Sequence, residues 1–140
     1  MGDERFLALL ADLTKRYDRR EITTDEFRLA AAAHLPAHSE DPKLETFFDQ
    51  WVNGTGIPAL KLSYSVKGKA PQLRLVGTIV QSDVESDFST LAPVEIEVAR
   101  GQTITQWVRT SSDPVTFTVP LKQAPLKVAL DPHYAVLRRM

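Results

Sequence analysis

Hydrophobic residues recur at helical spacing in the first third of the chain and alternate with polar residues in the remainder. In the first part, three groups of apolar side chains would each share one face of a helix. The groups are Phe6, Leu9, Leu10, Leu13 and Tyr17, then Phe27, Ala30, Ala31 and His34, and finally Leu44, Phe47, Phe48, Trp51 and Val52. This pattern predicts three amphipathic helices.

The first two helices have recognisable ends. We expect the first to run from about Asp3, as the N-cap, to Tyr17. Thr23 and Glu26 have the spacing of a capping box, in which each side chain accepts a hydrogen bond from the other's backbone. Pro36 ends the second helix because a proline cannot continue the hydrogen-bond ladder.

The third helix is predicted to open at Asp41-Pro42, an N-cap followed by proline at the first helical position. Gly54 stands where a C′ glycine would stop it. The segment Asn53-Gly54-Thr55-Gly56-Ile57-Pro58 then joins two parts of different character.

Beyond this joint, apolar and polar residues alternate with the period of a half-buried strand. Gly77 would mark a bulge in the second strand. A seventh strand would fit within residues 81–92. Short strands joined by tight turns, with no helix between them, predict an antiparallel immunoglobulin- or fibronectin-like β-sandwich of six or seven strands. The alternating segments cover residues 60–67, 73–80, 94–98, 103–109, 115–119 and 126–130.

Charge and composition divide the chain at the same place. Residues 1–53 hold eleven acidic and seven basic residues, a net charge of −4, whereas residues 54–140 hold ten basic and seven acidic, a net of +3. The second part also holds five of the six glycines and seven of the nine prolines. We therefore predict a mixed fold with two domains, a helical segment over residues 1–53 and a β-sandwich over residues 54–140.

The overall composition narrows the function classes. The chain has 140 residues, no Cys and three His, with a net charge of −1. Disulfide frameworks, Cys-based zinc sites and thiol catalysis are excluded. The near-neutral charge argues against a nucleic-acid partner. No apolar run is long enough for a transmembrane segment, and the first residues do not resemble a signal peptide.

Few residues form a pattern with catalytic chemistry. His34 and His38 have the i, i+4 spacing of a zincin helix, but Leu35 replaces the general-base Glu and Pro36 interrupts the helix. Glu95 and Glu97 share the outer face of one predicted strand, where we expect them to be solvated. No Ser lies in a G-x-S-x-G elbow, so a small stand-alone enzyme lacks a nucleophile.

Three segments nevertheless resemble a known family. They are Ile22-Thr23-Thr24-Asp25-Glu26-Phe27, then Leu44-Glu45-Thr46-Phe47-Phe48-Asp49-Gln50-Trp51-Val52, and then Gly54-Thr55-Gly56-Ile57-Pro58 with its following strand. Together they resemble the stretch that closes the catalytic region of M1-family (gluzincin) zinc aminopeptidases and leads into a β-sandwich. The segments Phe117–Leu121 and Pro125–Pro132 are similar to the end of that sandwich. The resemblance covers roughly residues 22–137.

The resemblance implies that the chain is the non-catalytic carboxyl-terminal region of a longer aminopeptidase. The family's H-E-x-x-H zinc site, its Gly-x-Met-x-Asn strand and its catalytic Tyr have no counterpart here. We therefore expect no catalytic, cofactor-binding or metal residue in this chain, with zinc and the peptide substrate belonging to the parent protein. The expected partner is the missing catalytic domain of the same polypeptide. The family-like residues form a structural joint consisting of Phe47, Phe48, Trp51, Gly54, Gly56 and Pro58.

The alternative is a free-standing fibronectin-like protein-interaction module with a helical prefix. In that case Trp107, on the face of its strand opposite Ile104 and Val108, would be the expected contact. The two interpretations share a fold and differ in what the chain binds.

Overall fold

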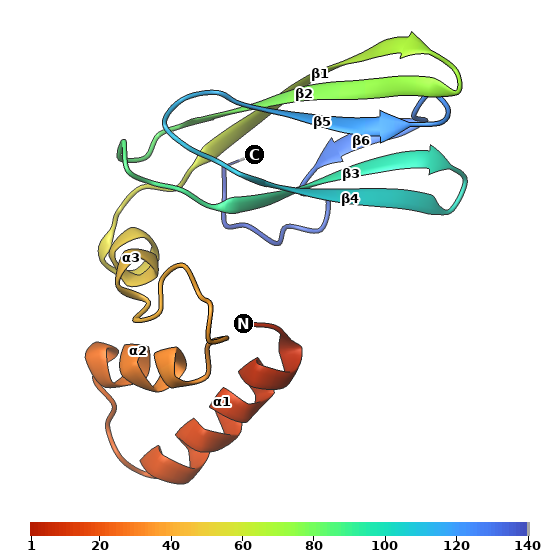
Figure 1. Ribbon diagram of the computed structural model, residues 1–140. Coiled ribbons are helices and arrows are strands. Elements are labelled where there is room, and N and C mark those ends of the chain that lie inside the picture. Colours follow the sequence, from red (N-terminus) through yellow and green to blue (C-terminus); the bar gives the residue numbers. More distant parts are fainter. Residues whose placement is uncertain (140) are drawn as a thin grey trace. The chain divides into compact units, whose positions relative to one another are not determined.

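Helices and strands occupy separate parts of the chain (Figure 1). The computed structural model describes residues 1–139 and divides the chain into two units, Met1–Thr55 and a second that begins at Gly56. The first unit holds three helices, and the second holds six strands. The predicted order of a helical segment followed by a β region is confirmed.

The first helix, α1, spans Asp3–Tyr17 as predicted, but its cap differs. Gly2 is the N-cap, with φ of 84°, and no side chain accepts a hydrogen bond there. The expectation that Asp3 is the N-cap is therefore wrong, because the chain turns into the helix one residue earlier. Asp3 and Glu4 instead lie in the first turn, where negative charge favours the helix dipole.

The capping box of α2 (Thr24–Ala33) is confirmed. The Thr23 hydroxyl accepts the N–H of Glu26 at 3.2 Å, and the Glu26 carboxylate accepts the N–H of Thr23 at 2.8 Å. The helix ends at Ala33, before Pro36, with His34 as the C-cap.

The third helix is shorter than predicted and changes its winding. It consists of α3 (Glu45–Phe48) followed directly by the π-helix η1 (Asp49–Asn53), so the predicted start at Pro42 is wrong. The Asp41 carboxylate accepts the N–H groups of Glu45 and Phe47 at 3.0 and 2.9 Å. Asp41 thus caps a helix that begins four residues further on.

The π-winding also changes which residues share a face. Its i→i+5 hydrogen bonds displace later side chains from an i, i+4 stripe. Phe48 is buried, whereas Val52 is 50% exposed. Gly54 stands at the end of η1, where it was expected to stop the helix, but it is the C-cap and its backbone is extended (φ −72°, ψ 155°), so it does not have the left-handed conformation typical of a C′ glycine. A Cβ at Gly54 would lie 2.7 Å from the Gln50 carbonyl oxygen, so close approach explains the glycine.

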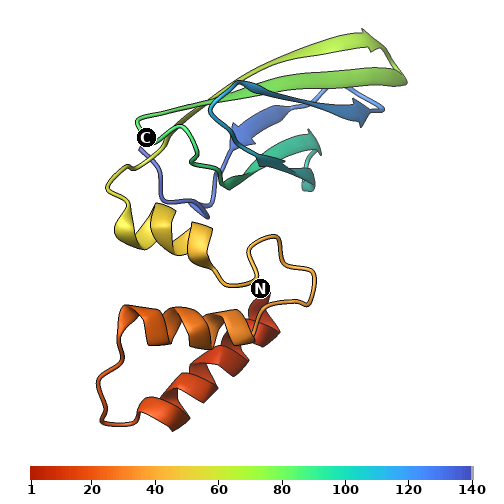
Figure 2. The same ribbon diagram turned by 60° about the vertical axis from the view of Figure 1, so that its left-hand side comes forward.

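The six strands form two antiparallel three-stranded sheets. One sheet has the order β1-β2-β5 and the other β4-β3-β6 (Figure 2). Residues 83–90 form no strand, so a seventh strand is absent from that part of the described chain. The strands are β1 (Ala59–Lys69), β2 (Gln72–Ser82), β3 (Leu91–Ala99), β4 (Gln102–Arg109), β5 (Val115–Leu121) and β6 (Lys127–Leu130).

Gly77 has a packing role and does not form the predicted bulge. The pairing register runs without a shift from Tyr64 through Gly77 to Phe117. A Cβ at Gly77 would overlap the end of the Phe117 ring. The glycine therefore makes room for an aromatic side chain on the neighbouring strand.

Residues from both sheets form a single hydrophobic core. The sheets are amphipathic, since in β2 Leu75 and Ile79 are buried whereas Arg74 and Val80 on the other face are exposed. The buried members of the core are Leu75, Ile79, Ala92, Val94, Ile96, Val108, Val119 and Leu121.

The helical unit has a much smaller core. Its buried cluster consists of Leu9, Ala30 and Ala31, with Leu13 and Leu44 packed against it. The cluster has only five members and two of them are alanines, so it buries little apolar surface.

A buried carboxylate organises the segment after β6. Asp131 is fully buried and has a positive φ of 44°, a conformation that Asp adopts more readily than most residues. Its carboxylate accepts the N–H groups of Ala135 and Val136 at 2.7 and 3.2 Å, and Nε of Arg138 at 3.3 Å. Beyond it, the N–H of Arg139 donates to the Pro58 carbonyl at 2.9 Å, so the segment ends beside the start of β1 (Figure 1).

We predict that Asp131→Ala destabilises the second unit by about 3–5 kcal/mol, because it leaves Arg138 and two backbone N–H groups without their acceptor. Asp83→Asn is the control, since Asn tolerates the positive φ of 66° at this position and the change removes only an ion pair with Arg139 that is exposed on both sides (66% and 47%). That change should cost about 1 kcal/mol or less. Urea unfolding of the full chain measures both, and equal losses would contradict the anchoring role of Asp131.

Candidate functional site

The joint residues of the helical unit surround one buried aromatic ring. Phe48 is only 5% exposed, and its ring centroid lies 6.1 Å from that of Phe27 and 5.9 Å from that of Phe47. Trp51 is half-buried, whereas Phe47 is 49% exposed. The structure thus assigns packing roles to Phe48 and Trp51 and leaves much of Phe47 open to solvent.

The joint residues of the second unit are fixed by close contacts. A Cβ at Gly56 would lie 3.0 Å from the Asp83 carbonyl oxygen and 3.2 Å from Cγ1 of Val84. Pro58 is fully buried, and its carbonyl accepts the N–H of Arg139. The close contacts explain why position 56 is a glycine, and the burial explains why position 58 is apolar. Both residues therefore have structural roles.

His34, the first residue of the zincin-like pair, forms a hydrogen bond with Asp12 within the helical unit. Its Nε2 lies 3.2 Å from Oδ2 of Asp12. This hydrogen bond, and secondarily those from Arg16, hold the pKa of Asp12 below its ordinary value. His38 lies in the exposed turn after Pro36. Across residues 1–139, no three His, Asp or Glu side chains are arranged to hold a metal ion.

His133 and Glu95 form a second imidazole–carboxylate pair, which sequence reasoning missed. Nε2 of His133 lies 3.1 Å from Oε1 of Glu95. The pair stands at a shallow hollow of about 180 Å³ that Glu97, Thr103 and Lys127 also line. An imidazole beside a carboxylate can transfer protons. However, the His133 side chain is 78% exposed, so the pair is a surface contact and does not stand in an enclosed site.

A larger hollow of about 680 Å³ lies in the helical unit, between the start of α2 and the α3–η1 segment. Arg28 lines it beside the carboxylates of Asp25, Glu45 and Asp49, and the Arg28 side chain is only 17% exposed. Its guanidinium donates to the Asp25 carboxylate at 3.2 Å and to the Lys43 carbonyl at 2.9 Å. Because these donors are engaged within the unit, Arg28 ties α2 to the chain before α3.

Trp107 lies on the outer face of β4, opposite Pro93 of β3, and is 53% exposed. On the same face, Leu91 is 44% exposed. Of the two apolar residues predicted for the inner face of β4, Val108 is buried as expected, whereas Ile104 is 37% exposed.

Comparison with known proteins assigns no family to the chain. No protein-family model matches the chain, and no curated protein matches it. Among the described residues, no helix combines the length and the apolar character needed to cross a bilayer.

The capping box of α2 makes the helical unit sensitive to acid. The backbone N–H and hydroxyl of Thr23 hold the pKa of Glu26 below its ordinary value of 4.5. A lowered folded-state pKa contributes stability that is present above the ordinary pKa and is lost as the pH falls through the folded value.

We therefore predict that the stability difference between the wild type and Glu26→Gln shrinks as the pH falls from neutral to about 3. Thermal unfolding followed by the helical far-UV circular dichroism signal measures this difference. Glu21→Gln is the control, because Glu21 precedes the box and does not close it. An unchanged difference across this pH range would contradict the role of the ionised carboxylate.

Proposed function

We propose that this chain is the non-catalytic carboxyl-terminal region of an M1-family zinc aminopeptidase. The helical unit closes the catalytic region, and the second unit is an immunoglobulin-like β-sandwich that braces it. The zinc and the peptide substrate belong to the catalytic domain of the same polypeptide. No residue of this chain takes part in the hydrolysis of the amino-terminal peptide bond.

The observation that carries the proposal is the exposed apolar surface of the helical unit. Large apolar side chains that are 44% to 63% exposed stand on all of its helices, beside a core of only a few residues. Such surfaces on a small unit are typical of an interface with other protein. These side chains are Phe6, Leu7, Leu10, Leu29, Phe47 and Val52.

The contacts of the joint support the same function. In the family that the sequence resembles, an aromatic helix leads through a Gly-x-Pro segment into a β-sandwich. Here Phe48 is buried in the helical unit, and Pro58 is buried at the start of β1. Each end of the joint is thus held within its own unit, in the order of elements that the resemblance implies.

The second unit has the properties of a brace. Its two sheets share one core, and Asp131 ties down the segment after β6. The antiparallel strands and short connections are also those of an immunoglobulin-like sandwich. A unit of this kind supplies a rigid surface and needs no reactive side chain.

We predict that antibodies against this chain capture, from its native cells, a longer polypeptide that hydrolyses aminoacyl-p-nitroanilides. The activity should disappear with a zinc chelator and return with Zn²⁺, because the metal activates the attacking water. The purified chain is the control and should release no nitroaniline with Zn²⁺. Metal-dependent activity of the purified chain, or capture of a polypeptide of only this length, would contradict the proposal.

Adjacent leucines on α1 provide a structural test. Leu9 is 2% exposed and Leu10 is 44% exposed. We predict that Leu9→Ala costs about 2–5 kcal/mol in the chain as it stands. Leu10→Ala should cost below about 1 kcal/mol, because it removes little buried surface. Helical circular dichroism during urea unfolding measures both.

The proposal gives the Leu10 change a second consequence. In the longer polypeptide, Leu10→Ala should lower the stability, because the face would there be covered. If Leu10→Ala costs as much as Leu9→Ala in this chain alone, the exposed face does not await a partner.

The second candidate function, a free-standing interaction module, is favoured by the exposure of Trp107. Exposed tryptophans are enriched where proteins bind one another. Capture of a polypeptide no longer than this chain, without aminopeptidase activity, would favour this function.

A further inference from the structure

The β1 strand presents a long free edge. It is the outermost strand of its sheet, with β2 on one side only. Among the described residues, its other side makes a single bridge, between Ala59 and Arg139. From Leu60 to Lys69 the backbone groups on that side have no strand partner, and both ribbon views draw β1 at the border of its sheet (Figure 1 and Figure 2).

The inner face of this edge strand changes character along its length. Leu60 and Leu62 pack against the core. Tyr64 and Val66 have the same parity and therefore point to the same face, yet they are 50% and 40% exposed. The half of β1 beyond Leu62 thus offers apolar side chains beside unpaired backbone.

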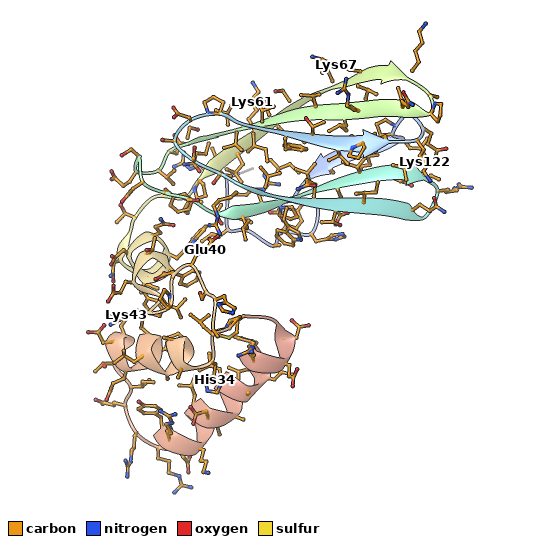
Figure 3. All side chains as sticks on the ribbon, viewed as in Figure 1. His34, Glu40, Lys43, Lys61, Lys67 and Lys122 are labelled. Carbon is orange, nitrogen blue, oxygen red and sulfur yellow. The ribbon has the colours of Figure 1, made fainter. Side chains whose placement is uncertain are left out.

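The outer face of the same strand is basic. Lys61, Lys67 and Lys69 share it, and Arg74 stands opposite Lys67 on β2. None of these four side chains belongs to an ion pair within residues 1–139. Figure 3 shows Lys61 and Lys67 on the side of β1 that faces away from the second sheet.

We propose that the edge of β1 between Leu60 and Lys69 binds an acidic, extended segment of a partner polypeptide, which adds a strand to the sheet. Main-chain hydrogen bonds supply the pairing, and alternate side chains supply the selectivity. The segment carries carboxylates on the face that meets Lys61, Lys67 and Lys69. It carries apolar side chains on the face that meets Tyr64 and Val66.

The lysines decide which strands can pair here. If two copies of β1 paired antiparallel about Tyr64, Lys61 of one would face Lys67 of the other. If they paired about Ser65, Lys61 would face Lys69. Like charges directly opposite destabilise a strand pair, so a second copy fits poorly. Lysines on an edge strand also discourage pairing with apolar strands of other proteins. An acidic strand, by contrast, would place carboxylates beside these lysines and form ion pairs with them.

The binding requires only the second unit and does not rest on the aminopeptidase proposal. Backbone pairing at this edge already occurs at its first residue, where Arg139 lies parallel to Ala59. A partner segment would continue the pairing along the rest of β1.

A fluorescent peptide of alternating Glu and Val tests the proposal with the full chain. We expect saturable binding by fluorescence anisotropy, with amide chemical shifts in the ¹⁵N spectrum that change along Leu60–Lys69. The same peptide with alternate backbone amides N-methylated should not bind, because it keeps its charges and loses its strand hydrogen bonds. A peptide of the same composition in blocks should also fail, because it lacks the period of two.

Two charge-reversal variants separate the edge from overall charge. Lys67→Glu/Lys69→Glu should weaken binding by about tenfold. Lys15→Glu/Lys43→Glu changes the net charge equally, at two exposed positions of the first unit, and should bind as the wild type does. A circular dichroism melt verifies that each variant is folded.

Several outcomes would overturn the proposal. They are no binding of the alternating peptide at millimolar concentration, equal binding of the N-methylated or block peptide, and equal weakening by both double variants. Dimerisation of the chain through β1, detected by sedimentation and by the same ¹⁵N shifts without peptide, would identify a second copy as the occupant.

Discussion

The shared core between the two sheets is the constraint on which the second unit depends. Each sheet has only one apolar face, and a three-stranded sheet alone cannot remove that face from water. When Leu75 and Ile79 of one sheet pack against Val94 and Ile96 of the other, the apolar faces of both sheets are removed from water. Once these side chains point inward, the pleat directs their neighbours outward. The positions of Trp107, Glu95 and the β1 lysines follow from that single choice.

A second, polar constraint completes this unit. The chain after β6 is irregular, and its backbone groups need acceptors and donors wherever they are buried. Asp131 supplies the acceptor for two of the N–H groups and for Arg138. Burying a carboxylate is costly unless it is paired, so the anchor holds the segment only while all three donors stay in place.

Local patterns were predicted best from the sequence. The α2 capping box depends on Thr23 and Glu26 alone, and α1 depends on apolar spacing within one helix. The start of α3 was misplaced because Asp41 reaches across four residues to cap it. Gly77 was misjudged because its reason is Phe117, forty positions away in the chain. The same limit applies to Asp131 and to the pair of His133 with Glu95. Their roles depend on chain segments that folding brings together.

The two exposed features of this molecule differ in physical kind. Burying the exposed apolar side chains of the helical unit against any surface that excludes water lowers the free energy, because the hydrophobic effect has no direction. The β1 edge is stabilised only by a strand that pairs in register, because its backbone hydrogen bonds are directional and its side chains alternate between the two faces. Exposed apolar side chains therefore suit permanent burial against other protein. A charged edge strand suits reversible selection of one segment among many. The same chain can hold both features without conflict, since the exposed apolar side chains belong to the first unit and the edge strand to the second.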